Sequence, residues 1–251
     1  MNRPPHTAIT AIGILALAGC CALSAAAAGG GPVDTHGAAS VSGTVRLDGL
    51  APKPTHIAMA SDQNCAKAHP SGASSEDVVV GPNGALGNVI VYISDGLGPA
   101  SFDPPPTPAT LEQKGCMYTP HVVAMQARQK LRVTNEDGTT HNIHPIPQNN
   151  REWNKSQPPG MQPLEETFPR EEIAIPIKCN IHPWMKSYLA VFKHPYFAVT
   201  SKDGSFDIHN LPPGNYTLMA WHEKFGTQVK KITVGAGASK VDVSFKSPLG
   251  N

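Results

Sequence analysis

Short apolar runs separated by turn residues make up most of the chain. Residues 41–47 alternate apolar and polar side chains and end at Asp48-Gly49, a pattern typical of a half-buried strand. The run at 88–94 is more continuously apolar, which predicts a more buried strand. Four further strands are predicted from similar patterns, at 121–127, 129–135, 171–177 and 187–193. No segment shows the period of a long amphipathic helix.

The predicted strand at 171–177 carries an expectation about its two faces. Ile173, Ile175 and Ile177 occupy alternate positions. Because successive side chains of a strand point to opposite faces, we expect the three isoleucines on one buried face. Cys179 continues the same alternation at the far end of the strand.

Three segments lack strand patterns: residues 51–84 read as a long connection, residues 96–108 as a proline-rich linker, and residues 145–170 as a long excursion.

The 23 glycines and 25 prolines lie between the apolar runs, which favours a turn-rich all-β fold. With 16% charged and 40% hydrophobic residues, the composition is that of a globular protein. A net charge of +1, without a basic stripe, argues against nucleic acid as a partner.

The N-terminus predicts export from the cytoplasm. Arg3 precedes an apolar run at 8–18, which has the polarity of a secretory signal. Residues 17–20 read LAGC and resemble the lipobox of bacterial lipoproteins, in which Cys20 would be lipidated. Ordinary cleavage after the alanine-rich stretch 22–28 is the alternative. Both predict a periplasmic location, either free or as a membrane-anchored lipoprotein, and a lipid anchor is the one membrane contact that we expect.

Cysteine usage singles out one thiol. The chain has five cysteines, and removal or lipidation of Cys20 and Cys21 leaves three in the folded part. Cys65 and Cys116 could form a disulfide in an oxidising compartment, although spacing alone leaves the pairing open. Cys179 would then be a free thiol that requires an explanation.

A group of metal-binding side chains surrounds Cys179. Residues 179–185 read CNIHPWM, so His182 and Met185 follow Cys179 at intervals of three, and His141 lies upstream after a predicted strand and turn. A thiolate, two imidazoles and a thioether suit copper, because sulfur favours Cu(I) and imidazole serves both oxidation states. We therefore predict one copper ion bound by His141, Cys179, His182 and Met185. His144 is a weaker candidate, because side chains three apart on an extended chain point to opposite faces.

These residues resemble the cupredoxins, the type 1 blue copper proteins of the amicyanin, pseudoazurin and plastocyanin type. The ligand loop of that family runs Cys, two residues, His, Pro, aromatic, Met, which 179–185 matches at each place. Asn135, Asp137 and the His141-Asn142 pair match its first ligand loop. The resemblance implies that Asn142 donates a hydrogen bond that ties the two loops, that His182 is a partly exposed exit for electrons, and that Pro183 and Trp184 lie on an apolar docking rim.

The C-terminal part resembles a second family. Residues 200–206 read TSKDGSF and residues 211–218 read LPPGNYTL, and both resemble the carboxypeptidase regulatory-like, transthyretin-like β-sandwiches. In that family the first strands read like 41–47 and 88–94, which implies a discontinuous sandwich with the copper-type domain inserted. His209 and His222 are expected to be ordinary surface or core residues.

The predicted fold is therefore all-β, with a cupredoxin-like Greek-key sandwich and a small carboxypeptidase regulatory-like sandwich. The predicted divisions are a signal at 1–28, a flexible tether at 29–40, an N-terminal β segment at 41–107 that would be the first part of the regulatory-like sandwich, the copper domain at 108–195, and the regulatory-like sandwich at 196–251.

The predicted function is one-electron transfer between exported redox proteins, whose identity the sequence does not give. A non-redox copper-binding or delivery protein is one alternative, and a structural or interaction protein with a vestigial site is another. No hydrolytic triad, paired carboxylate motif or second metal cluster is recognisable, so an enzyme is not expected.

Overall fold

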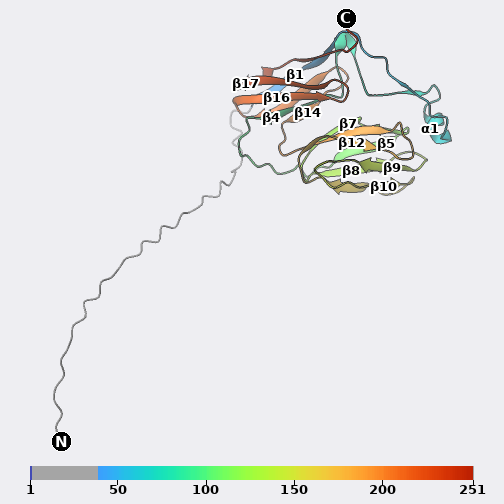
Figure 1. The fold of residues 1–251 in the computed structure, drawn as a ribbon, viewed down its shortest axis with the longest axis horizontal. Coiled ribbons are helices and arrows are strands. Elements are labelled where there is room, and N and C mark those ends of the chain that lie inside the picture. Colours follow the sequence, from blue (N-terminus) through green and yellow to red (C-terminus); the bar gives the residue numbers. More distant parts are fainter. Residues whose placement is uncertain (2–38, 251) are drawn as a thin grey trace.

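The computed structural model describes Met1 and residues 39–250, and the predicted signal, the lipobox with Cys20 and most of the tether lie outside these residues. The described part is built almost entirely of β-strands, so the all-β prediction is confirmed. Two β-sandwiches lie against each other (Figure 1). Within residues 39–250, no helix is long and apolar enough to span a membrane.

We call the sandwich that contains both the first and the last strand the outer sandwich. One of its sheets has the order β15-β1-β18, with β19 also paired to β1, and the other has the order β14-β4-β16-β17. The strands are β1 (Ala39–Asp48), β4 (Ile90–Asp95), β14 (Phe197–Val199), β15 (Ser205–Leu211), β16 (Gly214–His222), β17 (Gly226–Val234), β18 (Ser239–Lys240) and β19 (Val243–Lys246).

The central sandwich is drawn from one continuous stretch, from β5 to β13. Its sheets have the orders β10-β9-β12-β13-β7 and β11-β8-β5-β6. The strands are β5 (Ala109–Lys114), β6 (Met117–Thr119), β7 (Val122–Gln126), β8 (Lys130–Asn135), β9 (His141–Pro145), β10 (Lys155–Gln157), β11 (Leu164–Thr167), β12 (Glu172–Lys178) and β13 (Lys186–Phe192).

The connection between β1 and β4 contains the α-helix of the described chain. Its elements are β2 (His56–Ile57), α1 (Gln63–Ala68), β3 (Ala73–Ser74) and the short 3-10 helix η1 (Pro82–Gly84). In Figure 1, α1 lies at one end of the central sandwich, away from the outer sandwich. We call residues 59–72, which include α1, the cap.

Three apolar layers separate the four larger sheets. One fills the outer sandwich, a second fills the central sandwich, and a third lies between the two sandwiches. The third layer explains the continuous apolar run of β13. Leu189 and Val191 point into the central core, whereas Ala190 and Phe192 point into the layer between the sandwiches. Strand β4 is likewise covered on both faces, as its predicted burial requires.

The expectation for the three isoleucines of β12 is wrong for one of them. Ile175 and Ile177 are buried in the central core, but Ile173 packs against the layer between the sandwiches. The register of β12 against β13 shifts between Glu172 and Ile175, and Ala174 has a φ of 63°. An extra residue at such a bulge reverses the faces on its two sides, which moves Ile173 to the opposite face.

Candidate metal centre

Neighbouring strands bring the predicted metal ligands to one end of the central sandwich. His141 is the first residue of β9, and Cys179 directly follows the last residue of β12. The two strands are antiparallel neighbours, with Lys178 opposite His144. The loop from Cys179 to Met185 then leads into β13. Two backbone hydrogen bonds close this loop, from Cys179 N to Met185 O at 3.2 Å and from Met185 N to His182 O at 2.9 Å.

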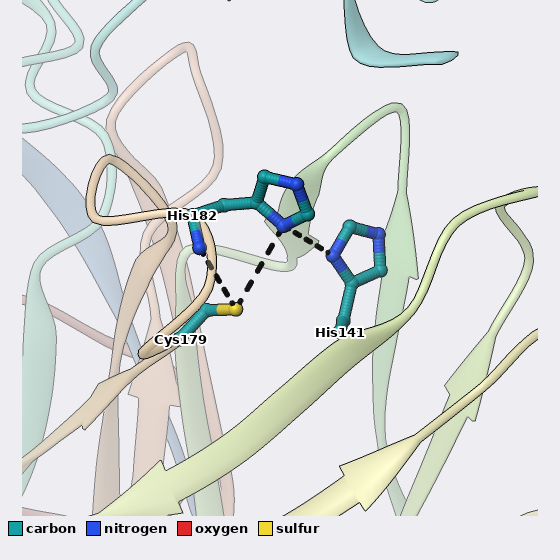
Figure 2. Close-up of side chains that lie close together, drawn as sticks. All are labelled: His141, Cys179 and His182. Carbon is teal, nitrogen blue, oxygen red and sulfur yellow. Dashed lines mark hydrogen bonds between the residues drawn. The ribbon is translucent and has the colours of Figure 1, made fainter. Parts of the chain in front are cut away.

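Three of the four predicted ligands converge. Figure 2 shows the Nδ1 atoms of His141 and His182 facing each other next to the sulfur of Cys179. The two Nδ1 atoms are 2.9 Å apart, and Sγ of Cys179 lies 3.9 Å from Nδ1 of His182. One ligand atom from each residue falls within 4.8 Å of the others. The arrangement can therefore hold one ion between a sulfur and two imidazole nitrogens.

The converging side chains are almost completely buried. His141 is 0% exposed, Cys179 is 2% exposed and His182 is 3% exposed. Burial of polar groups costs free energy unless each is paired, and here His141, Cys179 and His182 all have hydrogen-bond partners. Thiolate sulfur with imidazole nitrogen is a donor set that copper accepts in both oxidation states, so the residues present fit copper.

Met185 lies in the hydrophobic core rather than in solvent. It is fully buried and belongs to the same apolar cluster as Cys179. The backbone bonds at the base of the loop fix its position relative to Cys179 and His182. Its role as a fourth ligand remains a prediction.

The metal-free site favours a thiolate beside an imidazolium. Burial raises the pKa of Cys179, but hydrogen bonds from His141 and from backbone N–H groups outweigh it and lower the pKa to about 6. Burial lowers the pKa of His141, but hydrogen bonds to Asp137 and Cys179 raise it to about 9. The thiolate is the form of cysteine that binds metals, and a metal ion that binds Nδ1 of His141 would displace the proton held there.

Each ligand imidazole also contacts a carboxylate through its other nitrogen. Nε2 of His141 lies 2.9 Å from Oδ2 of Asp137, and Nε2 of His182 lies 3.3 Å from Oδ2 of Asp62. Asp137 also accepts hydrogen bonds from the backbone N–H groups of Gly115 and Cys116, at 2.6 and 2.8 Å. Carboxylates in this position fix the tautomer and orientation of metal-binding histidines.

Asp62 was not among the site residues predicted from the sequence. This residue belongs to the cap, which reads as a connection without chemistry, and it lies 120 positions from His182. The one available signal was the pairing of Cys65 with Cys116. The structure joins these two cysteines in a disulfide, which brings the cap to the end of the central sandwich where the ligands meet. Among the described cysteines, Cys179 is the free thiol.

Two asparagines shape the loops around the ligands. Asn135 donates to the carbonyl oxygens of Thr139 and Gln157, at 2.9 and 2.7 Å, and accepts from the backbone N–H of Asp137. Asn142 ties the two ligand loops as a donor and as an acceptor: its backbone N–H donates to Cys179, as expected. Its Oδ1 accepts a hydrogen bond of 2.6 Å from the backbone N–H of Asn180, because the loop after β12 presents a donor at that point.

The expectation that His182 is partly exposed is wrong. Asp62 and the cap cover its outer edge, so the imidazole has almost no contact with solvent. Trp184 is half-buried, and its Nε1 donates to the carbonyl oxygen of Cys116 at 3.0 Å. Pro183 is exposed, and so is Ile181. The exposed part of the ligand loop therefore lies beside His182 and not on it.

His144, His209 and His222 are not part of the group formed by the three converging ligands. Nε2 of His144 contacts Glu152 at 2.6 Å, and its Nδ1 lies 3.2 Å from Oδ1 of Asn180. His209 is exposed on the outer sandwich, and His222 is fully buried there.

Comparison with family models identifies one part of the chain. Residues 191–246 match the carboxypeptidase regulatory-like domain, which confirms the resemblance of the C-terminal segment. A comparison with curated proteins gives no match.

Similar solved structures are copper proteins. The Cu-containing nitrite reductase (NirK) from Thermus scotoductus SA-01 is 21% identical over 39% of this chain, with a TM-score of 0.33, and the chain spans 25% of its length. A purple cupredoxin from Nitrosopumilus maritimus is 22% identical over 33% of this chain and 98% of its own, with a TM-score of 0.29. The reduced state of an amicyanin mutant is 15% identical over 40% of this chain and 97% of its own, with a TM-score of 0.30. The C-terminal segment of the chain is thus similar to carboxypeptidase regulatory-like domains, and the solved structures similar to the chain include a copper nitrite reductase and cupredoxins.

Proposed function

We propose that the protein is a one-electron carrier that binds a single type 1 copper ion through His141, Cys179, His182 and Met185. The observation that carries the proposal is the buried convergence of the Cys179 sulfur with two imidazole Nδ1 atoms. Copper in such a site supplies a Cu(II)/Cu(I) couple. The protein must hold the ligands in one arrangement in both oxidation states of the copper.

The ligands are carried by rigid parts of the fold. His141 and Cys179 lie at the ends of paired strands, and hydrogen bonds hold the Cys179–Met185 loop in a closed shape. A rigid site changes little in geometry when the metal gains or loses an electron, which lowers the cost of electron transfer. These features support a carrier over a copper-delivery protein, because delivery requires ligands that an incoming partner can reach.

The closed site also argues against catalysis at the metal. His141, Cys179 and His182 are each at most 3% exposed, which leaves no open face at which a substrate could approach. We therefore propose that the partners are other redox proteins, which donate and accept the electron, and that the protein is not an enzyme.

We further propose that the protein works outside the cytoplasm, in the periplasm or attached to its membrane through a lipid on Cys20. The disulfide between Cys65 and Cys116 supports this proposal, because disulfides persist mainly in oxidising compartments.

The test is a visible absorption and electron paramagnetic resonance spectrum after addition of Cu(II). The proposal predicts an intense thiolate-to-copper band, narrow hyperfine splitting, and bleaching by ascorbate. A colourless Cu(II) signal of the ordinary type would favour the delivery protein, and no binding would favour the structural protein.

A further inference from the structure

The cap is attached to the ligand-bearing end of the central sandwich at several points. Cys65 is bonded to Cys116, Nε2 of His69 lies 2.7 Å from the carbonyl oxygen of Gly115, and Nδ2 of Asn64 donates to the carbonyl oxygen of Gly138 at 3.3 Å. The cap is thus held against both the β5–β6 turn and the loop that precedes His141. Its position over the ligands is a fixed part of the fold.

Asp62 uses its two carboxylate oxygens for different purposes. Oδ1 accepts from the backbone N–H groups of Asn64 and Cys65, at 2.7 and 3.1 Å, and so caps the N-terminus of α1. Oδ2 accepts from Oγ1 of Thr139 at 2.9 Å and lies 3.3 Å from Nε2 of His182. The two hydrogen bonds to the backbone of α1 orient the carboxylate of Asp62. They thereby direct Oδ2 at the imidazole of His182.

This contact decides which nitrogen of His182 carries the proton. A carboxylate oxygen is an acceptor, so Nε2 of a neutral His182 must be the N–H donor. The lone pair is then left on Nδ1, which faces His141 and Cys179. Asp137 has the same relation to His141, so two carboxylates flank the pair of imidazoles from outside.

We propose that Asp62 is a positioning residue for His182, which accepts the Nε2 proton, directs Nδ1 at the metal and closes the outer edge of the ring to solvent. The proposal rests on the proposed copper site. It assigns a role in that site to a segment outside the central sandwich. The carboxylate also increases the basicity of the imidazole, which stabilises Cu(II) more than Cu(I).

Removal of the Asp62–His182 contact should weaken Cu(II) binding about tenfold, the low end of the effects seen for such outer carboxylates. With Cu(I) affinity unchanged, a tenfold loss of Cu(II) affinity corresponds to a midpoint potential about 59 mV higher. The Nε2–H proton of His182 should also exchange faster with solvent in the Cu(I) protein.

The decisive variant is Asp62→Asn in the full chain. The asparagine retains an oxygen that can cap α1, but it presents an N–H group to Nε2 of His182, and two donors cannot bond to each other. The measurements are Cu(II) and Cu(I) affinities by competition with chelators, the midpoint potential, and exchange of the His182 Nε2–H proton by nuclear magnetic resonance. Asp62→Ala also removes the N-cap of α1. It should have the same raised midpoint potential as Asp62→Asn but a lower free energy of unfolding.

Two control variants separate the carboxylate contact from its surroundings. Asn64→Ala loosens the cap without touching His182. Glu136→Gln removes an exposed carboxylate beside Asp137, so it reports the effect of charge alone. Both should keep the wild-type potential and the slow exchange of the His182 proton.

An Asp62→Asn protein with wild-type affinities and potential would overturn the proposal. So would an equal shift in Asn64→Ala or in Glu136→Gln, because the effect would then arise from packing or from charge. Failure of the proposed function looks different, since the wild-type protein itself would then lack the intense copper band.

Discussion

The two nitrogens of each imidazole at the proposed copper site have different neighbours. Nδ1 of His141 and of His182 faces the thiol, and Nε2 of each faces a carboxylate. The orientation of both rings is therefore set before any metal arrives. A preorganised site avoids the free energy cost of ordering the ligands when the ion binds.

Substitution of the thiol tests the ligand assignment directly. Cys179→Ala should abolish the intense visible band, because the band arises from charge transfer between the thiolate and Cu(II). The matched control is His144→Ala, which should retain the band because His144 contacts Glu152 and Asn180 instead of the converging ligands. Loss of colour in His144→Ala would show that the ligand set is wrong.

The convergence of His141, Cys179 and His182 was predictable from the sequence, because these residues belong to short local motifs. Cys179, His182 and Met185 lie within one loop, and His141 lies at the end of a recognisable strand and turn. Asp62 and the burial of His182 were not predictable, because both depend on the cap, a segment from far away in the chain that packs over the ligands.

At the scale of elements, the disulfide attaches the cap across 51 positions of the chain. Removal of both cysteines, in Cys65→Ala/Cys116→Ala, should lower the free energy of unfolding by about 2–5 kcal/mol, because the unfolded chain gains freedom. Urea unfolding with and without dithiothreitol measures the effect. Reductant should lower the stability of the wild-type protein to that of the variant, and a variant that itself responds to reductant would contradict the assignment.

The contact between the loop at 148–150 and Glu172, the first residue of β12, should make the stability of the fold depend on pH. Glu172 accepts hydrogen bonds from the backbone N–H groups of Gln148, Asn149 and Asn150. Burial raises the pKa of Glu172, but these bonds and the Asn150 side chain outweigh it and hold the pKa below its ordinary value of 4.5. A depressed folded-state pKa adds stability above pH 4.5, and this stability is lost as the pH falls through the folded value.

Glu172→Gln should therefore lower stability by about 1–3 kcal/mol at neutral pH and make it less dependent on pH in the acid range. Urea unfolding over a series of pH values measures both effects. Glu171→Gln is the matched control, because Glu171 is more exposed and pairs with Lys193 at the surface. An acid slope in Glu172→Gln equal to that of the wild type would remove Glu172 as its source.

Elements with a clear alternating pattern were found from the sequence, and irregular ones were not. The predicted strand at 171–177 exists as β12, but its bulge at Ala174 was invisible because the isoleucines keep a regular spacing across it. Strands β10 and β11 lie within the excursion 145–170, where short polar strands carry no apolar pattern. The helix α1 is stabilised by its N-cap residue and by a disulfide instead of an apolar face, so it has no helical pattern of apolar residues.

At the scale of the whole molecule, the layer between the sandwiches joins them into one unit. Five of its twelve residues are aromatic, and the ring centroid of Phe192 lies 4.6 Å from that of Phe197 and 5.0 Å from that of Tyr92. Beside the layer, His121 of the central sandwich pairs with Glu223 of the outer sandwich. Nζ of Lys186, directly after Met185, lies 3.3 Å from Glu223 as well. The outer sandwich thus supports the base of the ligand loop.

Truncation of the central aromatic ring tests this connection. Phe192→Ala should lower the free energy of unfolding by about 3–5 kcal/mol, since the ring is fully buried. Denaturant unfolding measures the loss, and Val229→Ala on the exposed face of β17 should change stability by less than about 0.5 kcal/mol. A loss below about 1 kcal/mol in Phe192→Ala would mean that the two sandwiches are held together in another way.

The contact between the sandwiches could not be predicted from the sequence. A strand that is covered on both faces has the same apolar pattern whether its second face meets the same sandwich or another one. The all-β class followed from local patterns. The arrangement of the four sheets depends on which apolar faces pack against each other, and local patterns do not show this. Val122 and Val123 are equally apolar, although they point into different layers.

From the path of the chain through the two sandwiches we expect an order of folding. Strand β1 pairs in parallel with β19, and 198 positions separate Asp48 from Lys246, so the outer sandwich closes only when the last strand has been made. The central sandwich needs no strand after β13, and contacts between near neighbours in sequence form earliest. A chain that has formed only its central sandwich leaves the apolar face of β7 and β13 uncovered, the kind of surface on which partly folded chains aggregate. The arrival of the C-terminal strands decides how long that hazard lasts.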